Sequence, residues 1–360
     1  MDEVMPAAGL DRIAPDVAES IATRALTDAG VPPADSAAVA DALVHTSLRG
    51  ISTHGLRLLP QYLDDIAHGI ANPRPLRTVV RETGPTAVVD ADAALGIVAG
   101  LGGTREAVRR AARFGVSVVV VRNSNHFGAA SVYSRAMARE GMVGWVMTSC
   151  SPRVAPFNGS RAHLGTNPIS VAAGGGDHEF VLDMATSQVC LGEIRERGRQ
   201  GVPLEEGWAK DAAGRPTVDA AQVSTLTPLG AGHKGQALGM VVTLMTAVLA
   251  DSPLDWELEH IESAPHGRGR EVAHFLMCLD PAVFGGREAF DARMRTFVDD
   301  TRSSPASGAD PVRVPGDPER IRAARNAAHG IPLDPRTGRE LRRLAAGYGM
   351  DDLLTTTGIG

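Results

Sequence analysis

The chain has 360 residues, a length that accommodates about two domains, and its 43% hydrophobic and 22% charged residues are typical of a globular protein. Its formal net charge is -6, no run of basic residues stands out, and only 4% of the residues are aromatic. These values argue against nucleic acid or an anionic membrane as a partner, since both attract clustered positive charge.

The cysteines and the apolar segments predict a cytoplasmic protein without a metal centre. Cys150, Cys190 and Cys278 are far apart and follow no metal-ligand spacing, so we expect reduced thiols. The N-terminal sequence MDEVMPAAGLDRIAPD is acidic and lacks the apolar core of a signal peptide. The longest apolar stretch, Ala237 to Ala250, is shorter than the roughly 20 residues of a membrane span and predicts a buried helix instead.

The N-terminal part of the chain has apolar residues at helical spacing. Helices are predicted over Pro15 to Ala29 and Pro33 to Ser47, and a third from Pro60 to Gly69. Because proline suits the first turn of a helix but breaks its interior, Gly50 to Leu59 should be a bent connector.

Strand and helix signals then alternate from about residue 80 to 250, which is typical of an α/β or α+β domain. Leu101 to Phe114 predicts a helix. A Pro-, Ser- and Gly-rich linker is expected after about residue 300, and two short helices follow it, near Pro318–His329 and Arg339–Gly347. The predicted strands are TAVVDAD (86–92), VSVVVVRNS (116–124), VGWVMTS (143–149), PISVAA (168–173) and EFVLDMA (179–185).

His54 lies in RGISTHGLRLLPQYL (49–63), directly before a proline-led helix. It is either a proton-transfer residue for a small acid or part of an ordinary turn, and the residues alone leave both interpretations open. A hydrolase built on Ser52 or Thr53 with His54 is disfavoured, because a nucleophile beside its base in sequence is poor geometry for a triad. A metal site using His45 and His54 is disfavoured because their spacing is not helical.

Two glycine-containing segments bear on cofactor binding. GLGGT (100–104) lacks the full G-x-G-x-x-G pattern of a Rossmann site, and we expect its glycines at a helix N-terminus. VRNSNHFGAAS (121–131) places Asn123, Asn125 and His126 after an apolar strand. Polar residues at the carboxyl end of a strand commonly face a cleft, although the same residues also build turns and His126 also fits a core position.

The remaining motifs surround a long loop and a helix start. TSCSPRVAPFNGSRAHLGTNPIS (148–170) predicts an irregular, proline-fixed loop, a kind of segment that is often functional. Asp183 ends a strand and is also suited to cap the following helix. Lys234 lies between two glycines at the start of an apolar helix, where a cation opposes the helix dipole unless an anion is bound, so a phosphate-binding role is favoured.

Taken together, these segments resemble the malate/L-lactate dehydrogenase family of NAD(P)-dependent oxidoreductases that lack a Rossmann fold. The resemblance implies a helical domain built from both chain ends (1–78 with 300–360), a mixed-sheet cofactor-binding domain (79–299), and a homodimer with its site near the interface. The matching stretches are LRGISTHGLRLLPQYL, VRNSNHFGAASVYSRAMAREGMVGWVMT, SPRVAPFNGSRAHLGTNPIS, FVLDMATSQVCLGEI, GHKGQALGM and VRVPGDPE.

The resemblance also implies roles for individual residues. His54 matches the histidine that passes a proton to or from the substrate, His126 the histidine of the nicotinamide–substrate site, and Thr166 a substrate-contacting threonine. The positions expected to contact NAD or NADP are Asn125, Cys150, Asp183, Met184, Ala185, His233, Lys234, Gly316 and Asp317.

Three positions depart from the family pattern. Thr53 stands directly before the histidine, where the family usually has serine. Leu58 stands where the family has the arginine that binds the substrate carboxylate, so Arg57, and after it Arg49, are the candidates for that role. Glu193 stands where many members have lysine, which allows a relay of Thr53, His54 and Glu193 like that of the cyclic-imine reductase branch.

The sequence therefore predicts an NAD(P)-dependent oxidoreductase for a small 2-hydroxy or 2-oxo acid, with His54 as acid and base. Two alternatives remain open. Glu193 favours reduction of a cyclic imine-2-carboxylate, and the displaced arginine allows a catalytically inactive member of the family.

Overall fold

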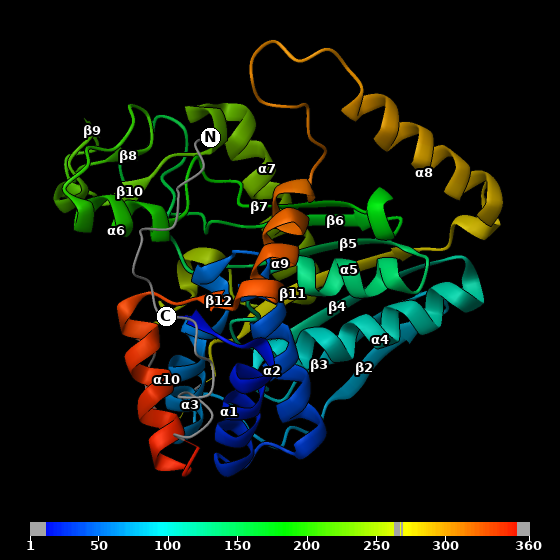
Figure 1. Cartoon of the computed structure of the whole chain (residues 1–360), viewed down its shortest axis with the longest axis horizontal. Coiled ribbons are helices and arrows are strands. Elements are labelled where there is room, and N and C mark those ends of the chain that lie inside the picture. The colour runs from blue at the N-terminus through cyan, green and yellow to red at the C-terminus, as the bar shows by residue number, and fades with distance from the viewer. Residues whose placement is uncertain (1–11, 263–266, 268, 351–360) are drawn as a thin grey trace. The chain divides into compact units, whose positions relative to one another are not determined.

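The computed structural model describes residues 12–262, 267 and 269–350. The chain divides into two compact units, Met1–Arg74 with Arg313–Gly360 and Pro75–Val312, and each is described by itself (Figure 1).

The first unit is helical and uses both ends of the chain. The predicted helix starts at Pro15 and Pro33 are confirmed. A two-residue antiparallel ladder pairs Ile13 with Ile331. The elements of the first unit are α1 (Pro15–Asp28), α2 (Pro33–Leu48), α3 (Leu59–Ala67), α9 (Asp317–His329), α10 (Pro335–Gly347), β1 (Arg12–Ile13) and β12 (Ile331–Pro332).

The bent connector expected over Gly50 to Leu59 is also confirmed. It consists of two 3₁₀ turns, Ser52–His54 and Leu56–Leu58. The end of α2 that leads into it is tied to α9, because the Asn326 side-chain amide donates to the Leu48 carbonyl at 2.9 Å.

The second unit contains a seven-stranded mixed sheet, which confirms the expected mixed α/β class. Its strand order is β2-β3-β4-β11-β5-β6-β7, and within it only β3 and β4 run parallel. The β4 strand has the predicted bounds, whereas β2 and the central β11 were not among the predicted strands. The strands are β2 (Thr78–Thr83), β3 (Thr86–Asp90), β4 (Val116–Ser124), β5 (Val143–Thr148), β6 (Ile169–Ala173), β7 (Phe180–Met184) and β11 (Val272–Leu279).

Helices cover both faces of this sheet. One face carries α4 (Gly96–Phe114) and α5 (Ser131–Arg139), and the other carries α7 (His233–Thr243), which continues into a π-helical segment (Leu244–Val248). The same unit also contains α6 (Leu191–Gln200) and α8 (Arg287–Arg302).

The helix α4 packs closely on the sheet through glycines in its interior. A Cβ on Gly103 would lie 2.8 Å from the Val121 side chain and 3.1 Å from that of Leu276. The expectation that GLGGT forms a helix N-terminus is therefore wrong, because α4 begins at Gly96 and these glycines follow one turn later. Their lack of a side chain serves close helix–sheet packing.

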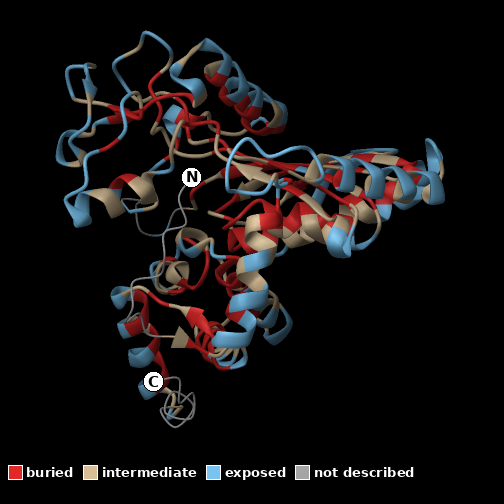
Figure 2. Ribbon diagram, turned by 45° about the horizontal axis from the view of Figure 1, so that its top comes forward, coloured by how far each residue is buried: buried red, intermediate tan, exposed pale blue. Residues whose placement is uncertain are grey.

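On the opposite face, alternate residues of the same strands meet α7 and the π-helical segment. Val120 and Phe275 form a buried cluster there with Val242 and Ala250. Figure 2 shows that the central strands are largely buried, whereas the helix surfaces turned away from the sheet are exposed.

The outer face of α7 and the π-helical segment corrects the expectation of a buried helix over Ala237 to Ala250. Six large apolar side chains there are at least 40% exposed in the single chain. These are Leu238, Met240, Val241, Leu244, Val248 and Leu249. We call this set the apolar face of α7. Among the described residues, none of the helices has the length and apolar character needed to cross a bilayer.

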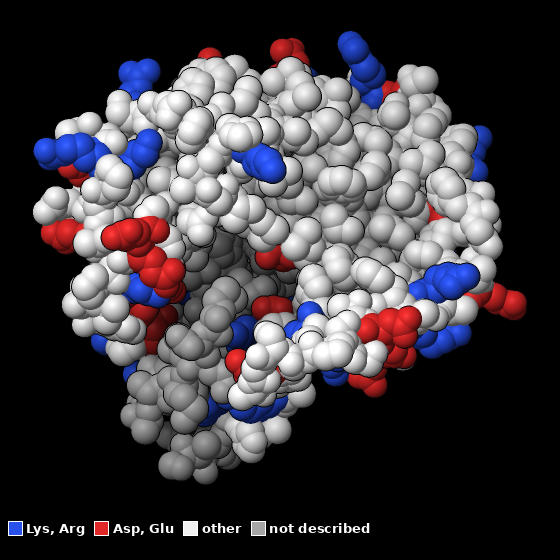
Figure 3. All heavy atoms as spheres, turned by 90° about the horizontal axis from the view of Figure 1, so that it is seen from above, with Lys and Arg blue, Asp and Glu red and all other residues white. Residues whose placement is uncertain are grey.

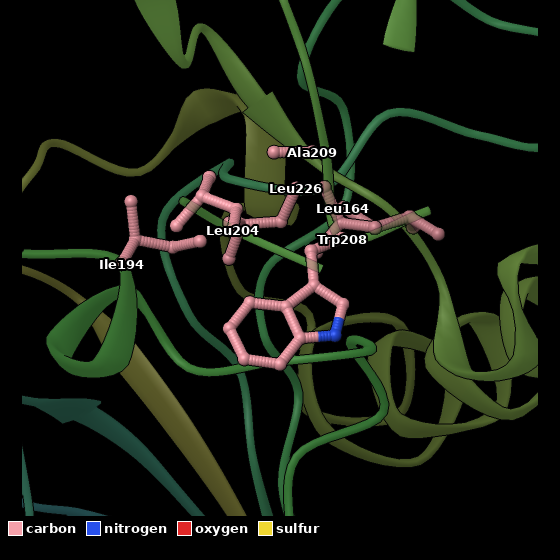
Figure 4. Close-up of a cluster of buried hydrophobic side chains, with 7 residues drawn as sticks. Leu164, Ile194, Leu204, Trp208, Ala209 and Leu226 are labelled. Carbon is pink, nitrogen blue, oxygen red and sulfur yellow. The ribbon is translucent and has the colours of Figure 1, made fainter. Parts of the chain in front are cut away.

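A small three-stranded sheet, with β8 (Ala209–Lys210) between β9 (Pro216–Thr217) and β10 (Thr225–Leu226), adds a second hydrophobic cluster. Figure 4 shows the Trp208 indole among aliphatic side chains that come from α6, β8, β10 and the loop at Leu164. The cluster consists of Val154, Leu164, Ile194, Leu204, Trp208, Ala209 and Leu226. It fixes the loop that ends directly before Gly165 and Thr166.

The charged side chains are mixed in sign. On the face drawn in Figure 3, lysines and arginines alternate with aspartates and glutamates, and wide uncharged areas separate them. A surface of this kind offers no extended field of one sign.

Candidate functional site

In the first unit, His54 is held by its neighbours in the connector. The Thr53 Oγ1 lies 2.8 Å from His54 Nδ1. Directly after the histidine, the Leu56 N–H donates to Ser47 Oγ at 2.9 Å. A Cβ on Gly55 would lie 2.1 Å from the same Ser47 Oγ, so only glycine lets the connector approach α2 this closely.

Burial lowers the pKa of His54 from its ordinary value of 6.5. The imidazole is therefore largely neutral at pH 7. A neutral imidazole accepts a proton without prior deprotonation, which suits it to act as a base.

The two arginines expected to bind a carboxylate occupy different environments. Arg57 is half-buried, and its charge helps to lower the pKa of Asp334, whose strongest stabilising partner is the Thr337 side chain at the start of α10. Arg49 caps the C-terminus of α2 and is only 5% exposed. Of the two, Arg57 is therefore the more accessible guanidinium.

The Gly316-Asp317 turn starts α9. Gly316 has a φ of +100°, which favours glycine, and Asp317 is buried. The Asp317 carboxylate accepts the Val314 N–H at 3.0 Å, so it closes its own turn. The N-cap of α9 is Gly316, so Asp317 stabilises the turn before the helix and does not cap the helix itself.

In the second unit, the Asn125–His126 turn follows β4 and is fixed by backbone contacts. The Asn125 side chain donates to the carbonyls of Ala93 and Ala94 at 2.8 and 2.9 Å and accepts the Arg270 N–H at 3.1 Å. Its amide thus holds three chain segments together. His126 is half-buried, and its Nδ1 lies 3.3 Å from the Gly128 N–H.

Below this turn lies a buried histidine that the sequence interpretation missed. His274 of β11 is fully buried, with Nδ1 2.8 Å from Thr148 Oγ1 and Nε2 2.8 Å from Ser124 Oγ. Its ring stacks on Phe127 at 4.5 Å. Burial lowers its pKa to about 3, so the ring is neutral. Through its contacts with Ser124 and Phe127, the ring supports the Asn125–His126 turn from both ends.

Thr166 occupies a turn that packs against Cys150. A Cβ on Gly165 would lie 2.5 Å from the Cys150 carbonyl oxygen, which explains the glycine. Burial raises the pKa of Cys150 to about 11, and the nearby Asp255 charge adds to this effect. The thiol is therefore protonated at neutral pH, which fits a contact residue and excludes a thiolate nucleophile.

The segment after β7 joins this turn. The Thr186 N–H donates to the Thr166 carbonyl at 2.8 Å, and its hydroxyl donates to the Asn167 carbonyl at 3.0 Å. Asp183, Met184 and Ala185 come directly before it and are half-buried.

Asp183 does cap a helix, but a different one from the helix expected. Its Oδ2 accepts the Ser131 N–H at 2.8 Å, at the start of α5. The next helix in the chain, α6, begins at Leu191 with no side-chain cap from this residue.

Lys234 and His233 form the first turn of α7 and are both exposed. The segment that leads to them is tied to the one after β7, since the Leu229 N–H donates to the Thr186 carbonyl at 2.9 Å. A Cβ on Gly235 would lie 2.1 Å from the Leu229 carbonyl oxygen, so the turn is tight. The N-cap of α7 is Gly232, and no side chain of the described residues caps the helix there.

A second residue missed in the sequence, Asp255, lies beneath the Thr166 turn. It is fully buried, and its Oδ2 accepts from Gly165 N, Asn167 Nδ2 and Thr243 Oγ1 at 2.9, 2.7 and 2.8 Å. Burial raises the pKa of Asp255 above its ordinary value. The sequence offered no signal for it, because DSPLDWELE is rich in charge and typical of a surface segment.

Glu193 lies in the first turn of α6 and is engaged by a neighbour. Its Oε1 accepts from Arg197 Nε at 3.1 Å, and the Arg197 guanidinium also lies over the Trp208 ring, 4.4 Å from its centroid. The carboxylate is thus part of an ion pair within its own helix. Among the described residues, no group of three His, Cys, Asp or Glu side chains could hold a metal ion.

Comparison with known proteins finds similarity over most of the chain. Residues 13–342 match the malate/L-lactate dehydrogenase family. Malate dehydrogenase from Pyrococcus horikoshii is 34% identical over 352 residues, which cover 95% of this chain and 97% of that protein.

Solved structures show the same fold. Sulfolactate dehydrogenase from Methanocaldococcus jannaschii superposes with a TM-score of 0.88 at 30% identity, covering 94% of this chain and 98% of the other. Delta1-piperideine-2-carboxylate reductase from Pseudomonas syringae pvar. tomato gives 0.83 at 26% identity, covering 93% and 100%.

The fold and the matched sequence define an oxidoreductase. The chain belongs to the malate/L-lactate dehydrogenase family, which confirms the resemblance drawn from its motifs.

Proposed function

We propose that the protein transfers a hydride between NAD or NADP and a small 2-hydroxy or 2-oxo acid, with His54 as the acid and base. The observation that carries the proposal is the 2.8 Å contact between Thr53 and His54 Nδ1, in a connector pinned to α2. Malate and sulfolactate dehydrogenases among the similar proteins support a small acid as substrate.

The residues at the start of α7 fit a nicotinamide dinucleotide. Lys234 is exposed, and no side chain of the described residues caps the N-terminus of α7. The lysine and the helix N–H groups therefore provide positive charge for a diphosphate. The cofactor would supply or accept the hydride at its nicotinamide ring. We propose further cofactor contacts from the neutral Cys150 thiol and from the Asp183–Ala185 segment next to Thr186. The remaining proposed contacts are Asn125, His126, His233 and the Gly316-Asp317 turn.

His54 moves the proton that accompanies the hydride. In oxidation, the substrate hydroxyl gives its proton to the neutral imidazole while its carbon loses a hydride; in reduction, the imidazolium returns the proton to the oxygen. We propose that His54 Nδ1–H donates to Thr53 Oγ1, which leaves the lone pair of the neutral ring on Nε2 to accept the substrate proton and fixes the ring orientation.

Arg57 is proposed to bind the substrate carboxylate, with Thr166 as a second polar contact. A guanidinium binds a carboxylate in a two-pronged geometry that fixes orientation as well as adding affinity. Arg57 already interacts with Asp334. A substrate carboxylate would therefore compete with Asp334 for the Arg57 guanidinium.

Reduction of a cyclic imine-2-carboxylate is the second candidate. It is favoured by the carboxylate of Glu193 and by the similarity to a piperideine-2-carboxylate reductase. In this structure Glu193 is paired with Arg197, so the relay would require that ion pair to open.

We also propose that the protein acts as a cytoplasmic homodimer. The apolar face of α7 supports this proposal. Its six large apolar side chains are at least 40% exposed in the single chain, and their exposure to water is unfavourable. Such a patch is typical of a surface that another chain covers. Sedimentation should give twice the 37.6 kDa chain mass.

The test of the function is to follow reduced nicotinamide absorbance with NADH and NADPH against a panel of 2-oxo acids and cyclic imines. We expect turnover of at least one acid. His54→Ala should abolish turnover and leave cofactor affinity unchanged, while His45→Ala, an exposed histidine of α2 paired with Asp41, should behave as wild type.

Lys234→Ala should weaken both dinucleotides without changing which acid is preferred. The proposal would be overturned if no acid or imine is turned over and neither dinucleotide shifts the melting temperature. Loss of cofactor binding in His54→Ala would overturn the acid–base assignment alone.

A further inference from the structure

The buried carboxylate of Asp255 links two segments that the proposed function assigns to different ligands. Its Oδ2 accepts from the backbone of Gly165 at 2.9 Å and from the side chain of Asn167 at 2.7 Å, and these residues flank Thr166 on both sides. The same oxygen accepts from Thr243 Oγ1 of α7 at 2.8 Å. One oxygen atom thus holds the Thr166 turn against the helix whose first turn carries Lys234.

Asn167 strengthens this link. Its Nδ2 also lies 3.0 Å from the Gly239 carbonyl oxygen and 3.1 Å from Thr243 Oγ1, so the amide contacts α7 directly. Its φ of +43° is a left-handed conformation that few residues other than glycine adopt, although asparagine tolerates it. Because this conformation is unfavourable, the hydrogen bonds of the amide must hold it in place.

The attachment point on α7 is itself unusual. Thr243 is the last residue before the helix changes to the π form at Leu244–Val248. Single π-helical turns interrupt the regular ladder and occur frequently at functional sites. The cluster therefore contacts α7 where its backbone geometry is least regular.

A purely structural role would not require a carboxylate at this position. Removing a charge from water is costly, and a well-packed apolar residue is often equally stable. Burial raises the pKa of Asp255, which reports this cost. The carboxylate is instead suited to accept three donors at one point, which fixes the positions of these donors relative to one another.

We propose that Asp255 is a positioning residue that holds the substrate-contacting Thr166 turn in register with the cofactor-binding helix α7. The inference rests on the proposed function for the roles of Thr166 and Lys234. The Asp255 charge has a second effect, since it adds to the rise in the Cys150 pKa that burial causes. Asp255 is fully buried, so its proposed role is to act through the Thr166 turn.

The test uses Thr243, because removal of Asp255 would leave the buried Gly165 N–H without its acceptor and would also take one acceptor each from Asn167 and Thr243, which threatens the fold. Thr243→Val removes one tie to the carboxylate and keeps the side-chain shape. Thr246→Val is the matched control, since Thr246 is equally buried on the next turn and donates only to the Val242 carbonyl at 2.7 Å. Thr243→Ser, which keeps the hydroxyl, is the rescue variant.

We expect amide exchange of the peptide around Gly165 to Asn167 to rise about tenfold in Thr243→Val, the size expected for one hydrogen bond to a buried charged group. We expect kcat/KM for the acid to fall about tenfold while the cofactor Kd changes less than about twofold, because the turn contacts the substrate. Thr243→Ser should restore both, and Thr246→Val should change neither.

The outcomes separate the two proposals. If wild type turns over an acid but Thr243→Val matches Thr246→Val in exchange and in kcat/KM, the positioning role of Asp255 is overturned and the proposed function stands. If Thr243→Val loses thermal stability with kcat/KM unchanged, the cluster is structural and the inference is also overturned. If wild type binds neither dinucleotide and turns over nothing, the proposed function fails and takes this inference with it.

Discussion

The imidazole of His274 is paired across the sheet with Thr148, which lies directly opposite in the β11–β5 ladder, and their Nδ1 and Oγ1 atoms are 2.8 Å apart. Because Nε2 of the same ring contacts Ser124 of β4, side chains join three adjacent strands at the edge where the Asn125–His126 turn begins. The ring is neutral, since its pKa is about 3.

The first prediction concerns stability at low pH. The pKa of His274 is about 3 in the folded state and about 6.5 when unfolded, so below about pH 6.5 the unfolded chain binds the extra proton. Between these values this one group lowers the free energy of unfolding by about 1.4 kcal/mol for each unit that the pH falls.

His274→Gln removes this titration and retains hydrogen-bonding capacity. Unfolding in denaturant from pH 7 to pH 4 should show a smaller loss of stability in the variant than in wild type. Parallel pH dependences for the two proteins would contradict the assignment of a buried, neutral histidine.

The second prediction is the pH dependence of turnover. Because burial holds the pKa of His54 below 6.5, the base needed for oxidation is already available at neutral pH. The kcat/KM for oxidation should rise with pH through a pKa that lies below 6.5 and then level off, and that for reduction should fall as pH rises through the same lowered pKa. Profiles that change only above pH 8 would assign the proton transfer to another group.

The third prediction tests the Thr53–His54 contact. Thr53→Val should lower kcat/KM about tenfold, since one hydrogen bond that orients the imidazole is lost, and Thr53→Ser should restore it. Ser52→Ala is the control, because Ser52 is exposed in the same 3₁₀ turn. Equal activity of Thr53→Val and Ser52→Ala would mean that the hydroxyl does not orient His54.

The fourth prediction concerns the close approach of the connector to α2. A Cβ at Gly55 would meet Ser47 Oγ at 2.1 Å, Ser47 N at 3.0 Å and the Leu43 carbonyl oxygen at 3.1 Å, and backbone atoms cannot move aside cheaply. Gly55→Ala should therefore lower the free energy of unfolding by about 1–3 kcal/mol.

Gly347→Ala serves as the control within the same unit, since a Cβ there meets nothing within 4 Å. It should leave the thermal midpoint unchanged. A stable, fully active Gly55→Ala protein would show that the connector can move away from α2.

Local patterns predicted the elements whose own residues determine them. The valine run of β4 is β-branched throughout its centre, and its bounds are the predicted ones. The central strand β11 was missed because its apolar run, VAHFLMCL, has only one β-branched residue, Val272, and such residues help to separate a strand from a buried helix segment. Its His274 could not be identified as a buried network residue without Thr148 and Ser124, which are far away in sequence.

The environment of a segment was harder to predict than its conformation. The composition of Ala237 to Ala250 indicated a helix, but not that one face would be exposed in the single chain. For Asp255 the difficulty was greater, because its burial depends on Gly165, Asn167 and Thr243, which come from two other segments. The motif resemblance located Thr166 but gave no information on the residue that holds its turn.

The first unit combines the earliest and the latest parts of the chain, with α1 packed on α10, α2 on α9 and β1 paired with β12. During synthesis, α1 and α2 therefore leave the ribosome long before α9 and α10, and the whole of Pro75–Val312 is made in between. Until the last segment arrives, apolar surfaces of the nascent helices lack their partners and are open to chaperones and to aggregation. Translation that stops after Val312 would thus release a chain with a complete sheet unit but an unfinished connector around His54.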